Sequence, residues 1–309
     1  MDTILGLLFV FLWASASTAA KYGFQTQPPL TVLSVRFAIA GAMMLAWSYG
    51  IRRNTAVPRG RQWLQLAVIG LTNSTLFLGA AWLALRDVSV GLYSLFLATM
   101  PFLVAVLSSF WLSRRVTRNE WLGIAIAAAG LVVVAAPSLA ASTATWQGLS
   151  LLVIAMLNQA IGSVYLKRVA LPLPSTVINT WQLILGLIFL LPFAVALNGD
   201  ATLQATPQLV GGLAWSILMV SVIANALLFT MQKRDPLWAS TWLLLAPVFS
   251  YLQAALVLGE PIRAFDIIGS ALVVAGLIIS GTIDLRRVVA ARAARAPVAP
   301  AQRPLPPPR

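Results

Sequence analysis

Arg36 is the one charged side chain that lies well inside a long apolar stretch of this 309-residue chain. It follows the start of that stretch, Leu30, by six residues, so it would lie about 9 Å along a helix from that end. If the stretch crosses a membrane, the charge is costly, and such charges usually serve a purpose. Arg36 could contact a solute, reach the surface, or pair with an acid. We expect the last, with Glu260 as its partner in a structural ion pair on the same side of the membrane.

Polar and aromatic side chains in the middle of other apolar stretches are further candidates. A polar group inside lipid must face a neighbouring helix or a cavity. For any one residue, an ordinary interhelical hydrogen bond explains its presence equally well. Similar groups recur in both halves of the chain, however, which favours a shared cavity. The candidate binding residues are Trp13, Ser17, Asn73, Ser94, Asn158, Asn225, Ser240 and Trp242.

The residue types exclude most other chemistry. The chain has no cysteine and no histidine, so disulfides and cysteine-ligated metals are ruled out, and proton transfer would need carboxylates, tyrosine or lysine. All eight acids fall in loops or near the ends of apolar stretches. Paired carboxylates, a phosphate-binding loop and a metal-ligand cluster are all missing from the sequence, so we expect no enzyme, no metal and no cofactor.

The composition places these candidates in a membrane. The chain is 60% hydrophobic and only 9% charged, and a soluble protein of this length could not bury so much apolar surface. The net charge of +13 does not indicate nucleic-acid binding, because the basic residues are spread over the loops between apolar stretches. Ten stretches approach the twenty residues that cross a bilayer. They are Thr3–Ala20, Leu30–Tyr49, Trp63–Leu85, Ser89–Trp111, Glu120–Ala136, Gly148–Tyr165, Thr176–Leu197, Leu209–Met231, Leu237–Leu258 and Phe265–Ile283.

The basic residues predict the orientation of the chain. Loops after the second, fourth, sixth and eighth stretches, together with the C-terminal segment, carry seventeen lysines and arginines. The alternate loops carry three: Lys21, Arg86 and Arg263. Because loops rich in Lys and Arg stay in the cytoplasm, we expect both termini there and Lys21 on the outer side.

An internal repeat organises the chain. A shift of 146 positions places Pro101 on Pro247, Gly123 on Gly269, and Gly130 on Gly276. A shift kept without gaps over most of both halves indicates a duplicated unit. Each unit has five stretches, an odd number, so the second copy would enter the membrane inverted. We therefore predict an all-α membrane protein of ten transmembrane helices in two inverted five-helix repeats. The repeats would span 1–140 and 146–285, and a basic, proline-rich cytoplasmic tail, expected to be disordered, would span 286–309.

In these features the chain resembles the EamA family of the drug/metabolite transporter superfamily. The matching features are Trp13 ahead of Lys21, Arg36-Phe37, a proline in the fourth stretch of each repeat, Leu258-Gly259-Glu260, and Gly269. One departure stands in the first repeat, where Leu112-Ser113-Arg114 replaces the family's usual Leu-Gly-Glu turn. The resemblance implies a ten-helix inner-membrane carrier with a central cavity that moves small metabolites such as amino acids or drugs, commonly outward.

The function that these observations predict is secondary transport by alternating access, as efflux or exchange. The solute would be small, amino-acid-like or drug-like, and neutral or zwitterionic. Because no acid lies in mid-membrane, we expect a facilitator or exchanger, with coupling at most through Glu260. The expected partners are the solute and the lipid bilayer, with no nucleic acid, and the carrier would be a monomer or homodimer. The alternative is a membrane-embedded structural or regulatory subunit with no solute path.

Overall fold

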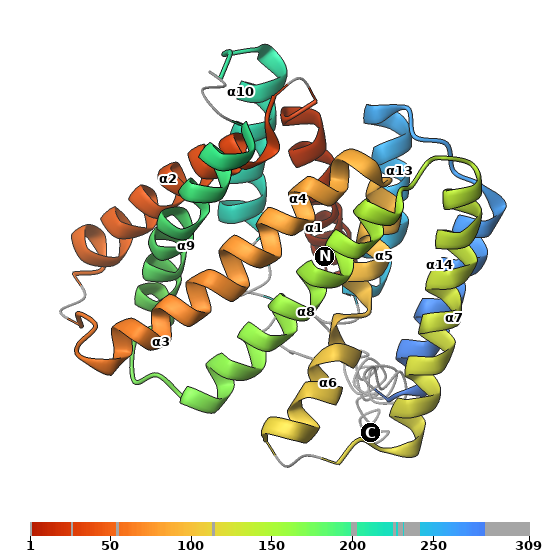
Figure 1. Cartoon of the computed structure of the whole chain (residues 1–309), viewed down its shortest axis with the longest axis horizontal. Coiled ribbons are helices and arrows are strands. Elements are labelled where there is room, and N and C mark those ends of the chain that lie inside the picture. The colour runs from red at the N-terminus through yellow and green to blue at the C-terminus, as the bar shows by residue number, and fades with distance from the viewer. Residues whose placement is uncertain are drawn as a thin grey trace, which may run out of the picture.

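Helices form all the regular structure in the part of the chain that the computed structural model describes (Figure 1). That part comprises residues 2–25, 27–53, 56–112, 115–198, 203–224, 227, 231 and 242–281. The first half contains α1 (Asp2–Gly23), α2 (Pro29–Leu45), η1 (Ala46–Ile51), α3 (Arg61–Gly70), η2 (Leu71–Leu76), α4 (Phe77–Asp87), α5 (Val90–Ala98), α6 (Met100–Trp111) and α7 (Arg118–Ala140). The second half contains α8 (Trp146–Val169), α9 (Ser175–Asn198), α10 (Pro207–Ala214), η3 (Trp215–Ala224), η4 (Leu243–Leu245), α13 (Ala246–Leu258) and α14 (Ala264–Ile279).

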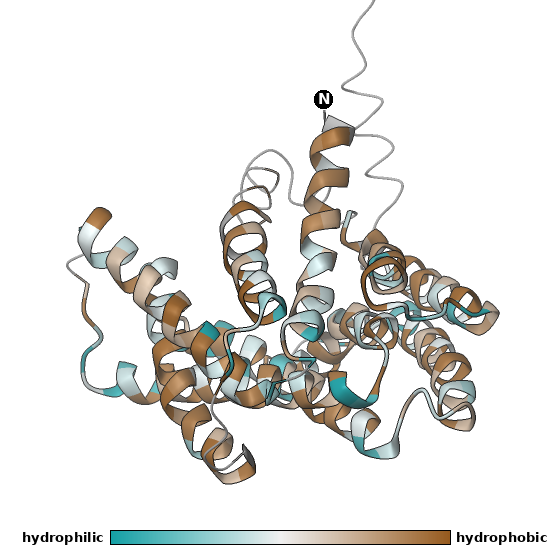
Figure 2. Ribbon diagram, turned by 90° about the horizontal axis from the view of Figure 1, so that it is seen from above, coloured by the Kyte–Doolittle hydropathy of each residue, from teal (hydrophilic) through white to brown (hydrophobic). Residues whose placement is uncertain are grey.

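The lengths and composition of these helices fit a bilayer. Within the described residues, seven helical segments are long and apolar enough to cross it, and three shorter apolar helices begin at Pro207, Ala246 and Ala264. Each of the ten overlaps one of the stretches predicted from the sequence. Large apolar side chains such as Leu256 and Phe110 are 86% and 77% exposed, as lipid-facing residues are. Figure 2 shows hydrophobic residues along most helices, with hydrophilic ones gathered mainly in the connections.

Helices α7 and α14 lie side by side and contact each other through glycines (Figure 1). A Cβ atom on Gly123 would stand 2.5 Å from the Gly276 carbonyl oxygen, and one on Gly130 would stand 2.7 Å from that of Gly269. Only glycine allows two helix backbones to approach so closely. The 146-residue shift places Gly123 on Gly269 and Gly130 on Gly276. Gly123 therefore contacts the equivalent of Gly130, and Gly130 contacts the equivalent of Gly123. This antiparallel, self-symmetric contact is what two halves inverted about an axis in the membrane plane would make.

The third segment of each half is interrupted at the same place. The π-helix η2 separates α3 from α4, and the π-helix η3 follows α10. Shifted by 146 positions, residues 71–76 become 217–222, which lie inside η3. Single turns of π-helix within an α-helix occur frequently at functional sites. The structure therefore repeats an irregular feature, and not only the apolar pattern.

The fourth segment of each half is also broken. Helix α5 ends before Thr99 and α6 begins at Met100, with Pro101 in its first turn. In the second half, η4 ends at Leu245 and α13 begins at Ala246, with Pro247 in its first turn. Proline is favoured in a first helical turn, whereas in a helix interior it lacks an N–H donor and its ring crowds an earlier carbonyl. Each proline therefore starts a new helix at equivalent positions.

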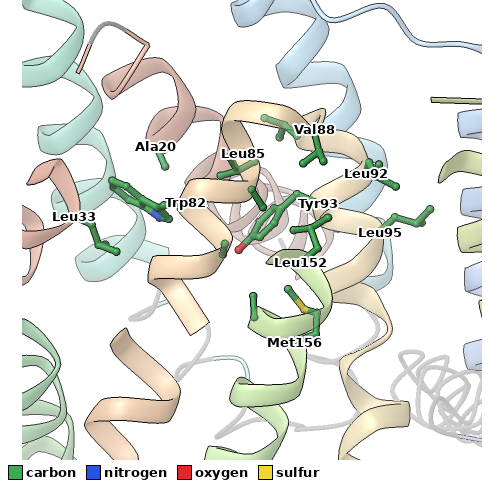
Figure 3. Close-up of a cluster of buried hydrophobic side chains, with 14 of the residues drawn as sticks. Ala20, Leu33, Trp82, Leu85, Val88, Leu92, Tyr93, Leu95, Leu152 and Met156 are labelled. Atoms are coloured by element: carbon green, nitrogen blue, oxygen red, sulfur yellow. The ribbon is translucent and has the colours of Figure 1, made fainter. Parts of the chain in front are cut away.

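The first helix of each half packs against the other half. Helix α1 contacts α10, η3 and α13, whereas α8 contacts α4, η2 and α6. Polar contacts fix α1 in place. The Trp215 indole N–H donates to Ser15 Oγ at 2.7 Å, and the Gln253 amide donates to the Phe11 carbonyl at 2.8 Å. The largest buried apolar cluster of the described residues joins α4, α5 and α8 to parts of α1 and α2, and Figure 3 shows Tyr93 and Leu152 between Trp82 on one side and Leu95 on the other.

Candidate functional site

Unpaired polar atoms lie at the interruption of the third segment. Among the described residues, the buried oxygens of Asn73 (Oδ1) and Ser74 (Oγ) have no hydrogen-bond partner. Both residues belong to η2, and Asn73 Oδ1 faces Gly162 of α8, where a Cβ atom would stand too close to it. Gln159 Oε1, one helical turn before Gly162, is also buried without a partner in the described structure. Because a buried polar group without a partner is costly, this contact between η2 and α8 is a candidate place for a solute or water to bind.

Two of the predicted tryptophans pack against one buried apolar cluster that includes Phe9 of α1. Trp13 packs against Phe9 with a ring-centroid distance of 5.8 Å, and Trp242 contacts the same buried cluster of Phe9 and Met231. Trp242 also covers Gly6, where a Cβ atom would overlap the indole ring. Trp13 and Trp242 thus pack against the same apolar cluster, which includes Phe9 of α1.

The remaining predicted binding residues are distributed differently. Ser17 is buried on α1 and donates to the Ala14 carbonyl of its own helix at 3.3 Å, and Ser94 is buried on α5. Asn158 lies beside exposed Ile154 and Leu157, and its amide donates to the Ile154 carbonyl at 2.8 Å. The other two, Asn225 and Ser240, lie outside the described residues. Whether these residues share one cavity stays a proposal.

The expected ion pair between Arg36 and Glu260 is wrong in its basic partner. Glu260 Oε1 accepts from Lys21 Nζ at 2.8 Å. Arg36 instead lies over the indole of Trp82, with its guanidinium carbon 5.7 Å from the ring centroid. The physical reason is that Lys21 is on the last turn of α1, level with the loop that carries Glu260, whereas Arg36 lies deeper in the bundle. Contact with an aromatic face stabilises a cation without a carboxylate.

One end of the bundle gathers charged residues. This end, the Lys21 end, is formed by the C-terminal turn of α1, residues 24–25 and 27–28, and the loops at 88–89, 141–145 and 259–263. A pocket of about 350 Å³ opens there, lined by the basic residues Lys21, Arg86 and Arg263 and the acidic residues Asp87, Glu260 and Asp266. These loops are the ones with few basic residues in the sequence. They lie together at one end of the bundle, as alternate loops of a chain that crosses a membrane repeatedly must.

Sequence reasoning missed several of these features. Gln159 and Gln253 were not singled out, although Gln159 is adjacent to Asn158 and three residues before Gly162, a spacing that puts it on the helix face toward η2. The Lys21–Glu260 pair could have been proposed from the charge pattern, because both residues lie in the loops predicted to face outward. The π-helices carry no recognisable sequence signal.

The fold and the candidate site together define a class of protein. Two inverted halves, interrupted helices at matching positions and unpaired polar groups beside them are typical of helical membrane transporters. Comparison with known proteins gives the family. The pattern of the EamA-like transporter family matches residues 3–136 and 146–282, so this chain belongs to that family, which is one of transporters and not of enzymes.

Individual relatives are more distant. The chain is 28% identical to the uncharacterized inner membrane transporter YedA of Escherichia coli, over 85% of each chain. It is 27% identical to an uncharacterized transporter of Synechocystis, over 84% of each chain. It is also 27% identical to a probable amino-acid metabolite efflux pump of Salmonella typhimurium, over 90% of this chain and 94% of the other. A solved crystal structure that is 19% identical superposes with a TM-score of 0.59 and covers 95% of this chain, which supports the fold alone.

Proposed function

We propose that this multi-pass membrane protein is a secondary carrier that moves a small neutral or zwitterionic metabolite by alternating access, as efflux or exchange. The observation that carries the proposal is the matched interruption of the third and fourth segments in both halves. Turns of π-helix within a helix occur frequently at functional sites, and transporters with inverted repeats bind their solutes near the bilayer midplane. Around η2 those groups include the unpaired oxygens of Asn73 and Ser74.

An amino-acid-like solute is the class we favour, with drug-like molecules as the broader possibility. The support is the name of the Salmonella relative, a probable amino-acid metabolite efflux pump. Location in the inner membrane is supported by the relative YedA. Amide and hydroxyl groups at the candidate site suit a zwitterion, whose ammonium and carboxylate groups donate and accept hydrogen bonds without requiring a buried counter-charge.

The competing function is a structural or regulatory subunit without a solute path. Such a subunit would satisfy its buried polar groups internally, as lipid-embedded helices must. The unpaired atoms on η2 and on α8 favour the carrier.

The carrier is tested with purified protein in liposomes. We expect at least one solute from a panel of amino acids and related metabolites to raise the melting temperature, because ligand at 100 times Kd adds about 2.7 kcal/mol to the stability of the folded state. The same solute should equilibrate down its own gradient with no pH gradient imposed, whereas protein-free liposomes retain it. A panel that neither stabilises the protein nor crosses the membrane would contradict the carrier. Strict dependence on a proton gradient, kept by Glu260→Gln, would contradict a facilitator or exchanger.

The orientation is a proposal with its own test. We propose that the Lys21 end faces outward and both termini face the cytoplasm, from the distribution of basic residues. Ser142 is exposed in the turn between α7 and α8 at this end. The chain has no cysteine, so Ser142→Cys provides a single label site. A membrane-impermeant maleimide added outside intact cells should label it. Labelling of this cysteine only after the membrane is made permeable would show that the Lys21 end faces the cytoplasm.

A further inference from the structure

Lys21 and Glu260 hold three parts of the molecule together at the Lys21 end. Lys21 Nζ donates to Glu260 Oε1 at 2.8 Å and to the Val88 carbonyl at 2.7 Å. The Val90 backbone N–H donates to Glu260 Oε2 at 2.9 Å. The side chains of Lys21 and Glu260 are only 21% and 17% exposed. One ion pair thus joins the end of α1, the first turn of α5 and the loop before α14, which come from both repeats.

The loop that carries Glu260 is itself held firmly. Helix α13 ends at Leu258 and is capped by Gly259, whose φ of +69° favours glycine, and the Glu260 N–H then donates to the Ala254 carbonyl at 3.2 Å. At the other end of the loop, Asp266 Oδ2 accepts from the Arg263 N–H at 2.9 Å, and Tyr251 Oη donates to Asp266 Oδ1 at 3.2 Å. Glu260 is therefore positioned to receive Lys21 without ordering a flexible loop.

We propose that Lys21 and Glu260 are the gate pair of the transport cycle: they close the Lys21 end, and the sequence places no equivalent pair at the opposite end. The carrier at rest is then biased toward the state that opens at the opposite end, the cytoplasmic side in the proposed orientation. The inference rests on the proposed carrier function, because a gate has meaning only where a solute passes. The three contacts join α1, α5 and the loop before α14, which would have to separate for the Lys21 end to open.

The bias follows from the repeat. In an inverted-repeat carrier, the residues that close one end have equivalents in the other repeat that close the opposite end. In this chain the equivalent residues are 146 positions apart. The mate of Lys21 is Lys167, whereas the mate of Glu260 is Arg114, so the equivalent positions hold two cations, which cannot form an ion pair. The mate of Val90 is Pro236, which has no N–H to donate. Arg114 and Pro236 lie outside the described residues, so this comparison is one of sequence alone.

A purely structural role for the pair gives different expectations. If the ion pair only supported the fold, its loss would lower the melting temperature and leave the access of a labelling reagent to the interior unchanged. If it is a gate pair, its loss shifts a population between two folded states. A shift of this kind changes accessibility by the factor by which the equilibrium changes, commonly about five- to 150-fold for coupled states.

Cysteine accessibility separates the two roles. Two reporter variants serve for this test: Ser17→Cys on α1, one turn before Lys21, and Ser94→Cys on α5, one turn after Val90. In the otherwise unaltered protein, both should react slowly with an impermeant maleimide added at the Lys21 end. In the Glu260→Gln and Lys21→Met backgrounds, at least one should react about fivefold faster or more. The double variant should react no faster than the faster single variant, because both changes remove one interaction.

Three controls make the result decisive. Ser142→Cys, exposed at the same end, should label equally in every background. Arg86→Gln removes an exposed cation that lines the same pocket but forms no ion pair in the described structure, and it should leave both reporters protected. Arg36→Gln combined with Glu260→Gln should give effects that simply add, since Arg36 is not the partner of Glu260.

Two outcomes would overturn the gate pair. One is unchanged labelling of both reporters in the Glu260→Gln and Lys21→Met variants while Ser142→Cys labels normally. The other is strict additivity of the two changes. Solute transport by the parent protein in liposomes is measured in parallel. Retained transport with unchanged labelling rejects the gate pair alone, whereas absence of any transported solute rejects the carrier function on which it rests.

Discussion

Gly276→Val is expected to destabilise the folded protein strongly, because it forces apart the two helices that join its halves. The Cβ atom would stand 2.5 Å from the Gly123 carbonyl oxygen and 3.1 Å from the Ala127 backbone nitrogen. Both are backbone atoms of a packed helix, so the clash cannot be relieved by a side-chain rotation. Overpacking typically costs about 1 to 3 kcal/mol, and α7 and α14 must move apart along their whole contact, so we expect the upper end of that range.

The measurement is the melting temperature of the purified protein in detergent. A loss of about 3 kcal/mol should lower it by roughly 6 to 12 °C for a chain of this size. Gly211→Ala is the matched control, because Gly211 also lies in a helix, α10, and a Cβ atom there meets nothing within 4 Å. That variant should be neutral or slightly stabilised, since alanine favours helix by up to about 1 kcal/mol over glycine. Equal melting temperatures for both variants would show that the α7–α14 contact does not depend on glycine.

The same prediction tests the symmetry of the fold. Gly123, Gly130, Gly269 and Gly276 form two reciprocal contacts, so Gly130→Val should destabilise the protein to a similar degree. The sequence already placed these glycines on each other through the 146-residue shift. It could not show that each contacts the mate of the other, because a repeat gives equivalence of position and not proximity in space. Proximity required the inversion of the second half and the antiparallel crossing that results from it.

Much of the fold was predictable because a lipid bilayer permits few backbone conformations. Every backbone polar group in the bilayer must be satisfied within the segment, so a long apolar stretch becomes a helix. The helix breaks at Pro101 and Pro247 were not predicted: both prolines were noted in the fourth stretch of each repeat, but each stretch was expected to be one continuous helix. The π-helices at η2 and η3 were not predictable. The first of them packs closely against another helix, with Asn73 of η2 against Gly162 of α8, and the local sequence does not contain that information.

The candidate site was less predictable than the fold. The sequence identified the polar residues in the middle of each span, but it did not show which groups they contact or hydrogen-bond to. Trp13 and Trp242 pack against the same buried cluster, whereas Asn158 donates a hydrogen bond to its own helix beside exposed apolar residues. The partner of Glu260 was assigned to Arg36 because depth was judged from span boundaries. An arginine can be stabilised by an aromatic face, and Trp82 provides that face for Arg36. Charge patterns limit the possible pairs but do not select among them.

Asn73→Leu is expected to abolish most transport while leaving the protein at least as stable. Asn73 Oδ1 is buried with no hydrogen-bond partner in the described structure, so its desolvation lowers the free energy of unfolding. An unsatisfied buried polar group costs about 1 to 3 kcal/mol, and an apolar side chain of similar size removes that cost. A solute that binds at this position would lose a hydrogen-bonding partner, and we expect transport to fall by about tenfold or more, the factor that corresponds to about 1.4 kcal/mol.

Thr75→Val supplies the contrast on the same turn of η2. Thr75 Oγ1 donates to the Gly186 carbonyl of α9 at 2.9 Å, so its hydroxyl is satisfied within the protein. Valine keeps the shape but removes that hydrogen bond between η2 and α9, so the melting temperature should fall by the equivalent of about 1 kcal/mol. Transport per folded molecule should change little. The two variants should therefore differ in opposite ways: Asn73→Leu should lower transport and keep stability, whereas Thr75→Val should lower stability and keep transport. If Asn73→Leu lowers stability and retains transport, Asn73 serves the fold, and the solute binds elsewhere.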